Sequence, residues 1–109
     1  MSAGRWGSAT HEYGLPVAGR VVEVLDDGAL IDGAPVRLTP APLAMLKALA
    51  TRPGHVLSRA ELMSHLPSGQ ALNEHAVEAA VARLRAAVGT ELVHTVVKRG
   101  YRLAMEPTP

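Results

Sequence analysis

The chain has 109 residues, of which 48% are hydrophobic and 19% charged, and its formal net charge at pH 7 is only +1. This length suits one domain with a modest core. Phenylalanine and cysteine are absent, so the core must be aliphatic, and disulfides and cysteine-ligated zinc are excluded. No apolar run approaches the roughly 20 residues that span a bilayer, and the first residues lack a signal-peptide pattern. We therefore expect a protein of the reducing cytoplasm with no membrane partner.

Composition separates a central domain from two terminal segments. Residues 1–16 are rich in glycine, serine and small polar residues, and we interpret them as a linker or flexible tail. Trp6 and Tyr13 leave an alternative, in which this segment docks on the domain. We place the domain at residues 17–105 and a short C-terminal tail at residues 106–109.

Three short strands are predicted at the start of the domain. Aliphatic runs occupy residues 20–25, 29–31 and 35–38, and Asp-Gly pairs lie between them. Asp-Gly is a strong hairpin signal because both residues tolerate positive φ. The pattern indicates a small antiparallel meander.

A first helix is predicted after the strands. Thr39 is a candidate N-cap, and Pro40 suits the first helical position because the N–H that it lacks would be unpaired there. Four apolar residues recur at helical spacing and predict the buried face: Leu43, Leu46, Leu49 and Ala50. The sequence Arg52-Pro-Gly54 ends this helix.

Two more helices are predicted from their caps. Ser58 and Glu61 have capping-box spacing and begin a short helix that Pro67 ends. Asn73 caps a third helix, and Gly89 terminates it.

The last predicted element is a β-hairpin with two cations in its turn. Residues 93–96 and 101–103 form its strands around the turn Val97-Lys-Arg-Gly100. An N-terminal antiparallel sheet, three helices and a C-terminal hairpin together define an α+β fold.

The helix at residues 73–88 carries the most informative pattern. One arc is apolar and is predicted to be buried: Val77, Val81, Leu84 and Val88. The opposite side is small and nearly uncharged: His75, Ala79, Ala82, Arg83 and Ala86. Such a face allows close approach to a major groove, where Ala79 and Ala82 can touch thymine methyl groups and Arg83 can fork onto guanine. The alternative is that alanine merely favours a helix.

Residues around the hairpin turn extend this candidate surface. Lys98 and Arg99 suit phosphate or minor-groove contacts, with solvated turn charges as the alternative. Thr95 and Tyr101 flank the turn and could donate hydroxyl hydrogen bonds to phosphate, unless Tyr101 is a half-buried strand aromatic. Arg85 lies near the edge of the buried arc and either reaches a phosphate or makes a structural salt bridge.

Together, the helix at 73–88 and the turn at 96–101 predict sequence-specific binding of duplex DNA, with the helix in the major groove. The alternative is a module for protein contact, with RNA polymerase or another subunit, which the small net charge favours. Strong salt dependence of binding would favour DNA.

An enzyme is the third hypothesis, and the motifs do not support it. His75 and Glu78 form a His-x-x-Glu pair on one helix, but no second pair accompanies them. We find no nucleophile elbow, phosphate loop or paired catalytic carboxylates. We therefore expect no catalysis, no metal and no cofactor.

A series of motifs lies within residues 20–104: Ile31-Asp-Gly33, Val36-Arg-Leu-Thr39, Pro53-Gly-His-Val-Leu-Ser-Arg-Ala-Glu-Leu62, Ala76-Val-Glu78, Ala82-Arg-Leu-Arg85, His94-Thr-Val96 and Gly100-Tyr-Arg-Leu103. In order and spacing they resemble the OmpR/PhoB-type winged-helix domain, the DNA-binding half of many bacterial response regulators. The resemblance implies a winged helix-turn-helix whose third helix enters the major groove and whose hairpin wing contacts the adjacent minor groove.

The resemblance also assigns roles by position. Arg83 matches the main base-recognising arginine, and Arg85, Thr95 and Tyr101 match positions that contact the DNA backbone. His75 falls where the family often has a phosphate-binding arginine.

The chain departs from the family pattern at several positions. Pro42 replaces a usual helix-capping Glu, and Ala82 replaces a common cationic residue. Val97-Lys-Arg-Gly100 replaces the usual Arg-Gly-x-Gly of the wing. Lys98 or Arg99 is then the candidate substitute for the minor-groove arginine.

One subgroup looks closest, on the stretches Glu74-His-Ala-Val-Glu78, Ala82-Arg-Leu-Arg85 and Thr95-Val-Val-Lys-Arg-Gly-Tyr-Arg-Leu103. These are actinobacterial regulators in which a uroporphyrinogen-III synthase-like domain precedes the winged helix. The resemblance implies a missing N-terminal sensory or enzyme-like domain. Because one such module buries little surface, we also expect two copies on repeated half-sites, with RNA polymerase as a candidate further partner.

Overall fold

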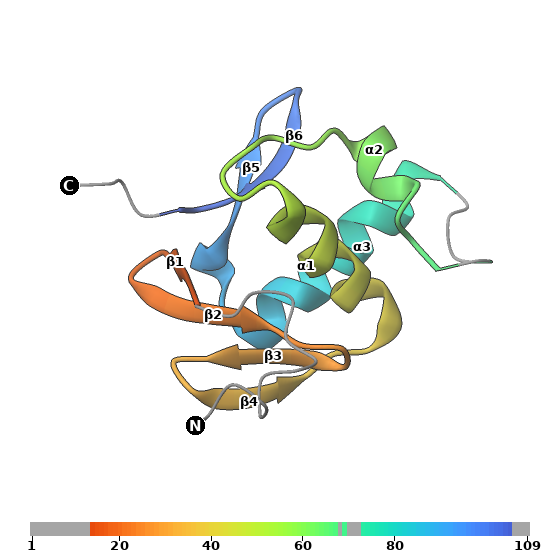
Figure 1. Ribbon diagram of the computed structural model, residues 1–109. Helices are drawn as coiled ribbons and strands as arrows, with labels where there is room; N and C mark the ends of the chain where they lie inside the picture. The colour runs from red at the N-terminus through yellow and green to blue at the C-terminus, as the bar shows by residue number, and fades with distance from the viewer. Residues whose placement is uncertain (1–13, 68, 70–72, 106–109) are drawn as a thin grey trace.

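The computed structural model of the chain describes residues 14–67, 69 and 73–105 (Figure 1). Its elements in chain order are β1 Leu15–Val17, β2 Arg20–Val24, β3 Gly28–Ile31, β4 Ala34–Arg37, α1 Pro40–Thr51, α2 Arg59–Met63, α3 Glu74–Val88, a 3₁₀ turn Thr90–Leu92, β5 Val93–Val96 and β6 Gly100–Leu103. This order confirms the predicted α+β class. Among the described residues, none of the helices has the length and apolar character that a bilayer span requires. Trp6, Tyr13 and most of the two predicted tails lie outside the described residues.

The strands β1 to β4 form one antiparallel sheet in sequential order. β2, β3 and β4 match the predicted strands to within one residue at each end. In the turn between β3 and β4, Asp32 and Gly33 have φ values of 52° and 84°. Both are positive, as a tight two-residue hairpin turn requires, so the Asp-Gly signal at this turn was informative.

Strand β1 departs from the prediction, because it begins inside the segment interpreted as a tail. It pairs with β2 through Leu15↔Val22 and Val17↔Arg20. Pro16 lacks a backbone donor, and a three-residue strand that contains it has almost no sequence signal. Val17 is 0% exposed, so its burial in the core holds this segment next to β2. The four-stranded sheet therefore begins at Leu15, two residues before the position at which we placed the start of the domain.

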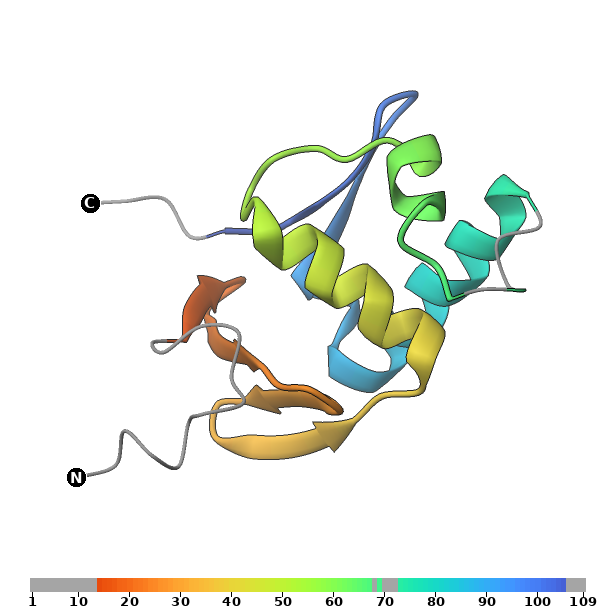
Figure 2. The ribbon, with the colours of Figure 1, turned by 45° about the vertical axis from the view of Figure 1, so that its right-hand side comes forward.

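Helix α1 runs through the middle of the fold (Figure 2). Thr39 is the N-cap residue, as predicted, and has the extended backbone of that position, but its side chain makes no capping hydrogen bond. The predicted face is buried, and so are further residues around the helix: Ala41, Pro42, Met45 and Ala48. The sequence pattern understates this burial because the helix contacts β2 as well as α3 and β6.

Helix α2 begins with the predicted capping box. The Glu61 N–H donates to Ser58 Oγ at 3.0 Å, and the Ser58 N–H donates to the Glu61 carboxylate at 2.8 Å. The backbone hydrogen bond from Ser58, followed by the side-chain one, lowers the pKa of the Glu61 carboxyl below its ordinary value. α2 ends at Met63, short of the predicted stop at Pro67, although Leu66 beyond it is still buried.

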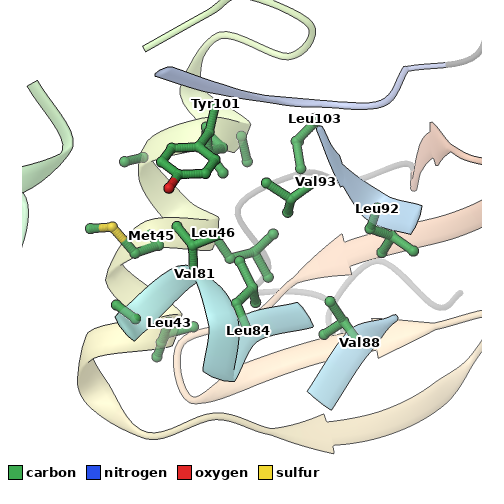
Figure 3. Packing of buried hydrophobic residues seen from close by; sticks show 14 of the residues in the cluster. Leu43, Met45, Leu46, Val81, Leu84, Val88, Leu92, Val93, Tyr101 and Leu103 are labelled. Carbon is green, nitrogen blue, oxygen red and sulfur yellow. The ribbon is translucent and has the colours of Figure 1, made fainter. Parts of the chain in front are cut away.

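The core is aliphatic, as the absence of phenylalanine requires. Figure 3 shows side chains from α1, α3 and the C-terminal strands packed against one another. The largest fully buried residues include Met45, Leu46, Leu49, Leu84 and Leu103. No polar or charged residue of the described segments belongs to the buried class, so apolar packing determines how the helices lie against the sheet.

The C-terminal hairpin is anchored to the loop that precedes α2. β5 pairs with β6 up to Val96↔Gly100, and Leu57 pairs with Tyr101 on the other edge of β6. The Leu57 N–H donates to Tyr101 O at 2.9 Å, and the Tyr101 N–H donates to Leu57 O at 3.0 Å. A Cβ on Gly100 would overlap the Leu57 carbonyl oxygen, so this close approach requires glycine.

Candidate nucleic-acid interface

Helix α3 turns the predicted face outward. The Asn73 side chain caps the helix by accepting a hydrogen bond from the His75 N–H at 2.9 Å. The predicted apolar arc is buried, together with Ala80. The residues on the opposite side are exposed: His75, Ala79, Ala82, Arg83 and Ala86. Burial of the aliphatic arc fixes the rotation of the helix and therefore which side chains face out.

Arg83 lies in the middle of this exposed face. Ala79 and Ala86 lie on neighbouring turns, and neither extends beyond a methyl group. Within the segments that the structure describes, Arg83 takes part in no ion pair. Its planar guanidinium can therefore present two donors to an external acceptor.

The turn between β5 and β6 presents two cations. Lys98 and Arg99 are both exposed, as predicted. The Arg99 N–H donates to Val96 O at 2.9 Å and closes the turn, and Lys98 has a φ of 64°. Neither cation forms an ion pair within residues 14–67, 69 and 73–105.

The exposed helix and the hairpin are held together by Arg85. Its Nε and Nη2 donate to Val93 O at 3.1 and 2.7 Å, and Nη2 also donates to Thr95 Oγ1 at 2.8 Å. Arg85 therefore has a structural role, through a carbonyl and a hydroxyl rather than through the salt bridge considered in the sequence. Its contact with a phosphate stays a prediction. Figures 1 and 2 place the hairpin and the N-terminal end of α3 away from the four-stranded sheet.

Tyr101 lies at the base of the hairpin and is only 5% exposed. Figure 3 shows its ring among core side chains. The guanidinium carbons of Arg59 and Arg85 lie 5.8 and 5.7 Å from the ring centroid, within cation–π range. Tyr101 is thus buried more deeply than the half-buried alternative, and its predicted hydrogen bond to phosphate is untested.

Arg59 joins this region without having been predicted. Its Nε lies 3.1 Å from Glu78 Oε2, but the N–H is not directed at the carboxylate and makes no hydrogen bond. Glu78 Oε1 lies 3.3 Å from His75 Nδ1. The spacing of His75 and Glu78 is visible in the sequence, whereas Arg59 reaches Glu78 only because α2 packs on α3.

Two further roles of His75 were considered from the sequence: a contact with phosphate, and a metal-binding pair with Glu78. Its side chain is 86% exposed and remains accessible to a phosphate. Among the described residues, no group of three or more potential ligands could hold a metal ion. The His75–Glu78 pair is accompanied by the Arg59 cation instead of a third ligand.

Comparison with known proteins gives a family. Residues 33–103 match the model of the family described as "Transcriptional regulatory protein, C terminal". The TorCAD operon transcriptional regulatory protein TorR of Escherichia coli K12 is 36% identical over 77 residues, which are 69% of this chain and 34% of that protein. The transcriptional regulatory protein CseB of Streptomyces coelicolor is 35% identical over 85 residues, which are 75% of this chain and 36% of that protein. The chain spans about a third of the length of both relatives.

A solved structure agrees with the fold. The DNA-binding domain of Klebsiella pneumoniae RstA, in complex with the RstA box, is similar with a TM-score of 0.64 and 25% sequence identity, covering 86% of this chain and 98% of that one. The family match covers more than half of the chain. The chain therefore belongs to the family of C-terminal domains of transcriptional regulatory proteins, and its fold is the OmpR/PhoB-type winged helix.

Proposed function

We propose that this domain binds duplex DNA as the output domain of a bacterial transcriptional regulator. Helix α3 enters the major groove, and the β5–β6 turn contacts the flanking backbone or minor groove. The family and the RstA complex with its DNA box support this function. The observation that carries it is the exposed Arg83 at the centre of an alanine face.

The dimensions and chemistry of α3 suit a major groove. A helix with its side chains is about 10–12 Å across, and the groove is about 12 Å wide. The methyl groups of Ala79 and Ala82 let the helix backbone come close to the base edges, where they can touch thymine methyl groups. Arg83 can then donate two hydrogen bonds to O6 and N7 of a guanine. Base discrimination is therefore assigned mainly to Arg83.

Phosphate contacts supply most of the affinity in this proposal. Lys98 and Arg99 provide the charge, and His75 lies exposed at the start of α3. Thr95 accepts a hydrogen bond from Arg85, which leaves its hydroxyl proton able to donate to a phosphate.

Arg85 and Tyr101 complete the predicted set of backbone contacts. Their interactions within the domain support a positioning role, in which they fix the hairpin relative to α3. A direct phosphate contact by either side chain is a separate part of the proposal.

A contact with another protein, RNA polymerase or a subunit, is the second candidate function. The net charge of only +1 favours it. Binding to duplex DNA releases counterions, so the log of the binding constant falls with the log of the salt concentration by about 0.9 per phosphate neutralised. If the surface contacts a protein instead, binding to duplex DNA should not show this salt dependence.

The test of the DNA function starts from duplexes selected out of a random pool by the chain. Arg83→Ala should weaken binding to the selected site by about 1–3 kcal/mol and change binding to random DNA little. The matched control is Arg37→Ala, which removes an exposed arginine from β4 and should change neither. Equal losses on selected and random DNA would argue against base recognition by Arg83, and no selectable duplex would argue against the whole proposal.

We further propose that the chain is the C-terminal part of a longer regulator of the uroporphyrinogen-III synthase-like subgroup, acting in pairs on repeated half-sites. The relatives are about three times as long as the region that they share with this chain, which supports a further domain. Coding sequence upstream of Met1 would identify that domain, and its absence would contradict this part of the proposal.

A further inference from the structure

Val97 is the most exposed large hydrophobic residue of the described segments. Its exposed fraction is 77%, and Val21, at 49%, is the other residue of this kind. Val97 lies in the turn directly before the two cations Lys98 and Arg99. An apolar side chain at the apex of a projecting turn stays in contact with water in the free domain, and burying it requires a binding partner.

The backbone holds this turn in one shape. The hydrogen bond from the Arg99 N–H to Val96 O closes it at 2.9 Å. Its base is fixed because Gly100 lies against the Leu57 carbonyl and leaves no space for a Cβ. Val97 is also β-branched, so its side chain has little rotamer freedom to lose on binding. The valine is therefore presented in a nearly fixed position.

On the basis of the proposed DNA function, we propose that Val97 contacts the deoxyribose walls of the minor groove next to the site occupied by α3. The minor groove is about 6 Å wide, and proteins that enter it frequently insert apolar side chains. The sugar C–H groups that line it are an apolar partner of the right size for a valine. Lys98 and Arg99 then face the phosphates at the rim of the groove.

This role predicts that substitution of Val97 affects the salt dependence of DNA binding differently from substitution of Lys98 or Arg99. A contact between a valine and sugar C–H groups involves no charge, so it contributes affinity without counterion release. Loss of Lys98 or Arg99 should instead lower the salt dependence by about 0.9 per phosphate contact. The salt slope therefore separates the apolar contact from the two cationic ones.

The experiment compares Val97→Ala and Val97→Thr with the unmodified 109-residue chain on a selected duplex, over a range of salt concentrations. Both variants should bind about three- to tenfold more weakly with an unchanged salt slope, because buried methyl groups are lost or replaced by a hydroxyl. Val97→Thr keeps the side-chain shape and tests apolarity alone. Val21→Ala, which shortens the exposed valine of β2, is the matched control and should bind like the unmodified chain.

Hydroxyl-radical cleavage of the bound duplex reports on the sugars directly, because the radical attacks deoxyribose hydrogens in the minor groove. At saturating protein, the unmodified chain should protect a short patch of sugars beside the α3 site, and Val97→Ala should protect that patch less while protection elsewhere stays the same. Unchanged affinity or unchanged protection in Val97→Ala, wild-type affinity of Val97→Thr, or a lowered salt slope would each overturn the contact. If the unmodified chain binds no duplex, the proposed DNA function itself fails; if it binds and only the valine effects are missing, that function stands.

Discussion

Lys98 shows how a single residue can be strained at a candidate binding site. Its φ of 64° lies in the left-handed region, where a side chain with a Cβ is disfavoured by about 1–2 kcal/mol. The sequence predicted a turn at residues 97–100, but a lysine gives no sequence signal for a left-handed backbone conformation. The residue is kept in this conformation by the closed turn and by the fixed base of the hairpin.

Lys98→Gly should therefore stabilise the domain while it weakens DNA binding. Relief of strain outweighs the greater freedom of glycine in the unfolded chain, which offsets about 0.4–1 kcal/mol, so we expect a net gain of about 0.5–1 kcal/mol in the free energy of unfolding. Denaturant unfolding measures the gain, and duplex binding measures the lost charge.

Arg99→Gly is the control for this substitution. Arg99 is not among the residues with positive φ, so glycine there relieves no strain and should lower the stability slightly. If both substitutions change the stability equally, strain at Lys98 is not the cause.

Two neighbouring elements, α3 and β5, are joined by the Arg85 side chain. Three hydrogen bonds from one guanidinium reach a carbonyl and a hydroxyl on the strand. Hydrogen bonds from a charged donor that is partly shielded from water are stronger than neutral ones. Arg85 thus helps to set the distance between α3 and the hairpin, which a DNA duplex would have to match.

Arg85→Lys should lower the free energy of unfolding by about 1–2 kcal/mol, because one ammonium cannot reproduce the planar fork. Thermal or denaturant unfolding provides the measurement. Lysine keeps the positive charge, so the salt slope of DNA binding should stay the same.

Arg85→Ala separates the two roles that the sequence left open. If Arg85 acts only within the domain, removal of the charge lowers stability and leaves the salt slope unchanged. A slope reduced by about 0.9 in Arg85→Ala, but not in Arg85→Lys, would show a phosphate contact after all.

For the molecule as a whole, stability depends on α1, which is packed on several sides. Leu49 is 0% exposed, and its helix contacts β2, α3 and β6. Cavities in such a position cannot close easily, because neighbouring elements are held by their own packing.

Leu49→Ala should lower the free energy of unfolding by about 2–5 kcal/mol, a large fraction of the about 5–15 kcal/mol typical of a domain. Circular dichroism during denaturation should show the helices and the sheet lost in one transition. Thr51→Ala, at an exposed position of the same helix, removes the hydrogen bond from Thr51 Oγ1 to Ala48 O. Because alanine has the higher helix propensity and offsets much of this loss, stability should change by about 0.5 kcal/mol or less. Separate transitions for sheet and helices would contradict a shared core.

Local patterns predicted most of the elements because their causes lie within a few residues. The capping box of Ser58 and Glu61, the Asp32-Gly33 turn and the apolar arc of α3 each depend on neighbours in the sequence. The same arc implied the exposed face around Arg83, since burial of one side of a helix turns the other to solvent.

Contacts between distant segments could not be inferred in this way. β1 exists because Val17 is buried in the core, and the ring of Tyr101 has two arginines beside it, Arg59 from α2 and Arg85 from α3, that are far apart in the sequence. The free energy of such contacts appears only when the whole chain has packed, so short sequence patterns carry little trace of them. Composition and periodicity thus specified the class of fold and the surface around Arg83, whereas packing between elements assigned Arg85 to β5 and left Val97 exposed beside the two turn cations.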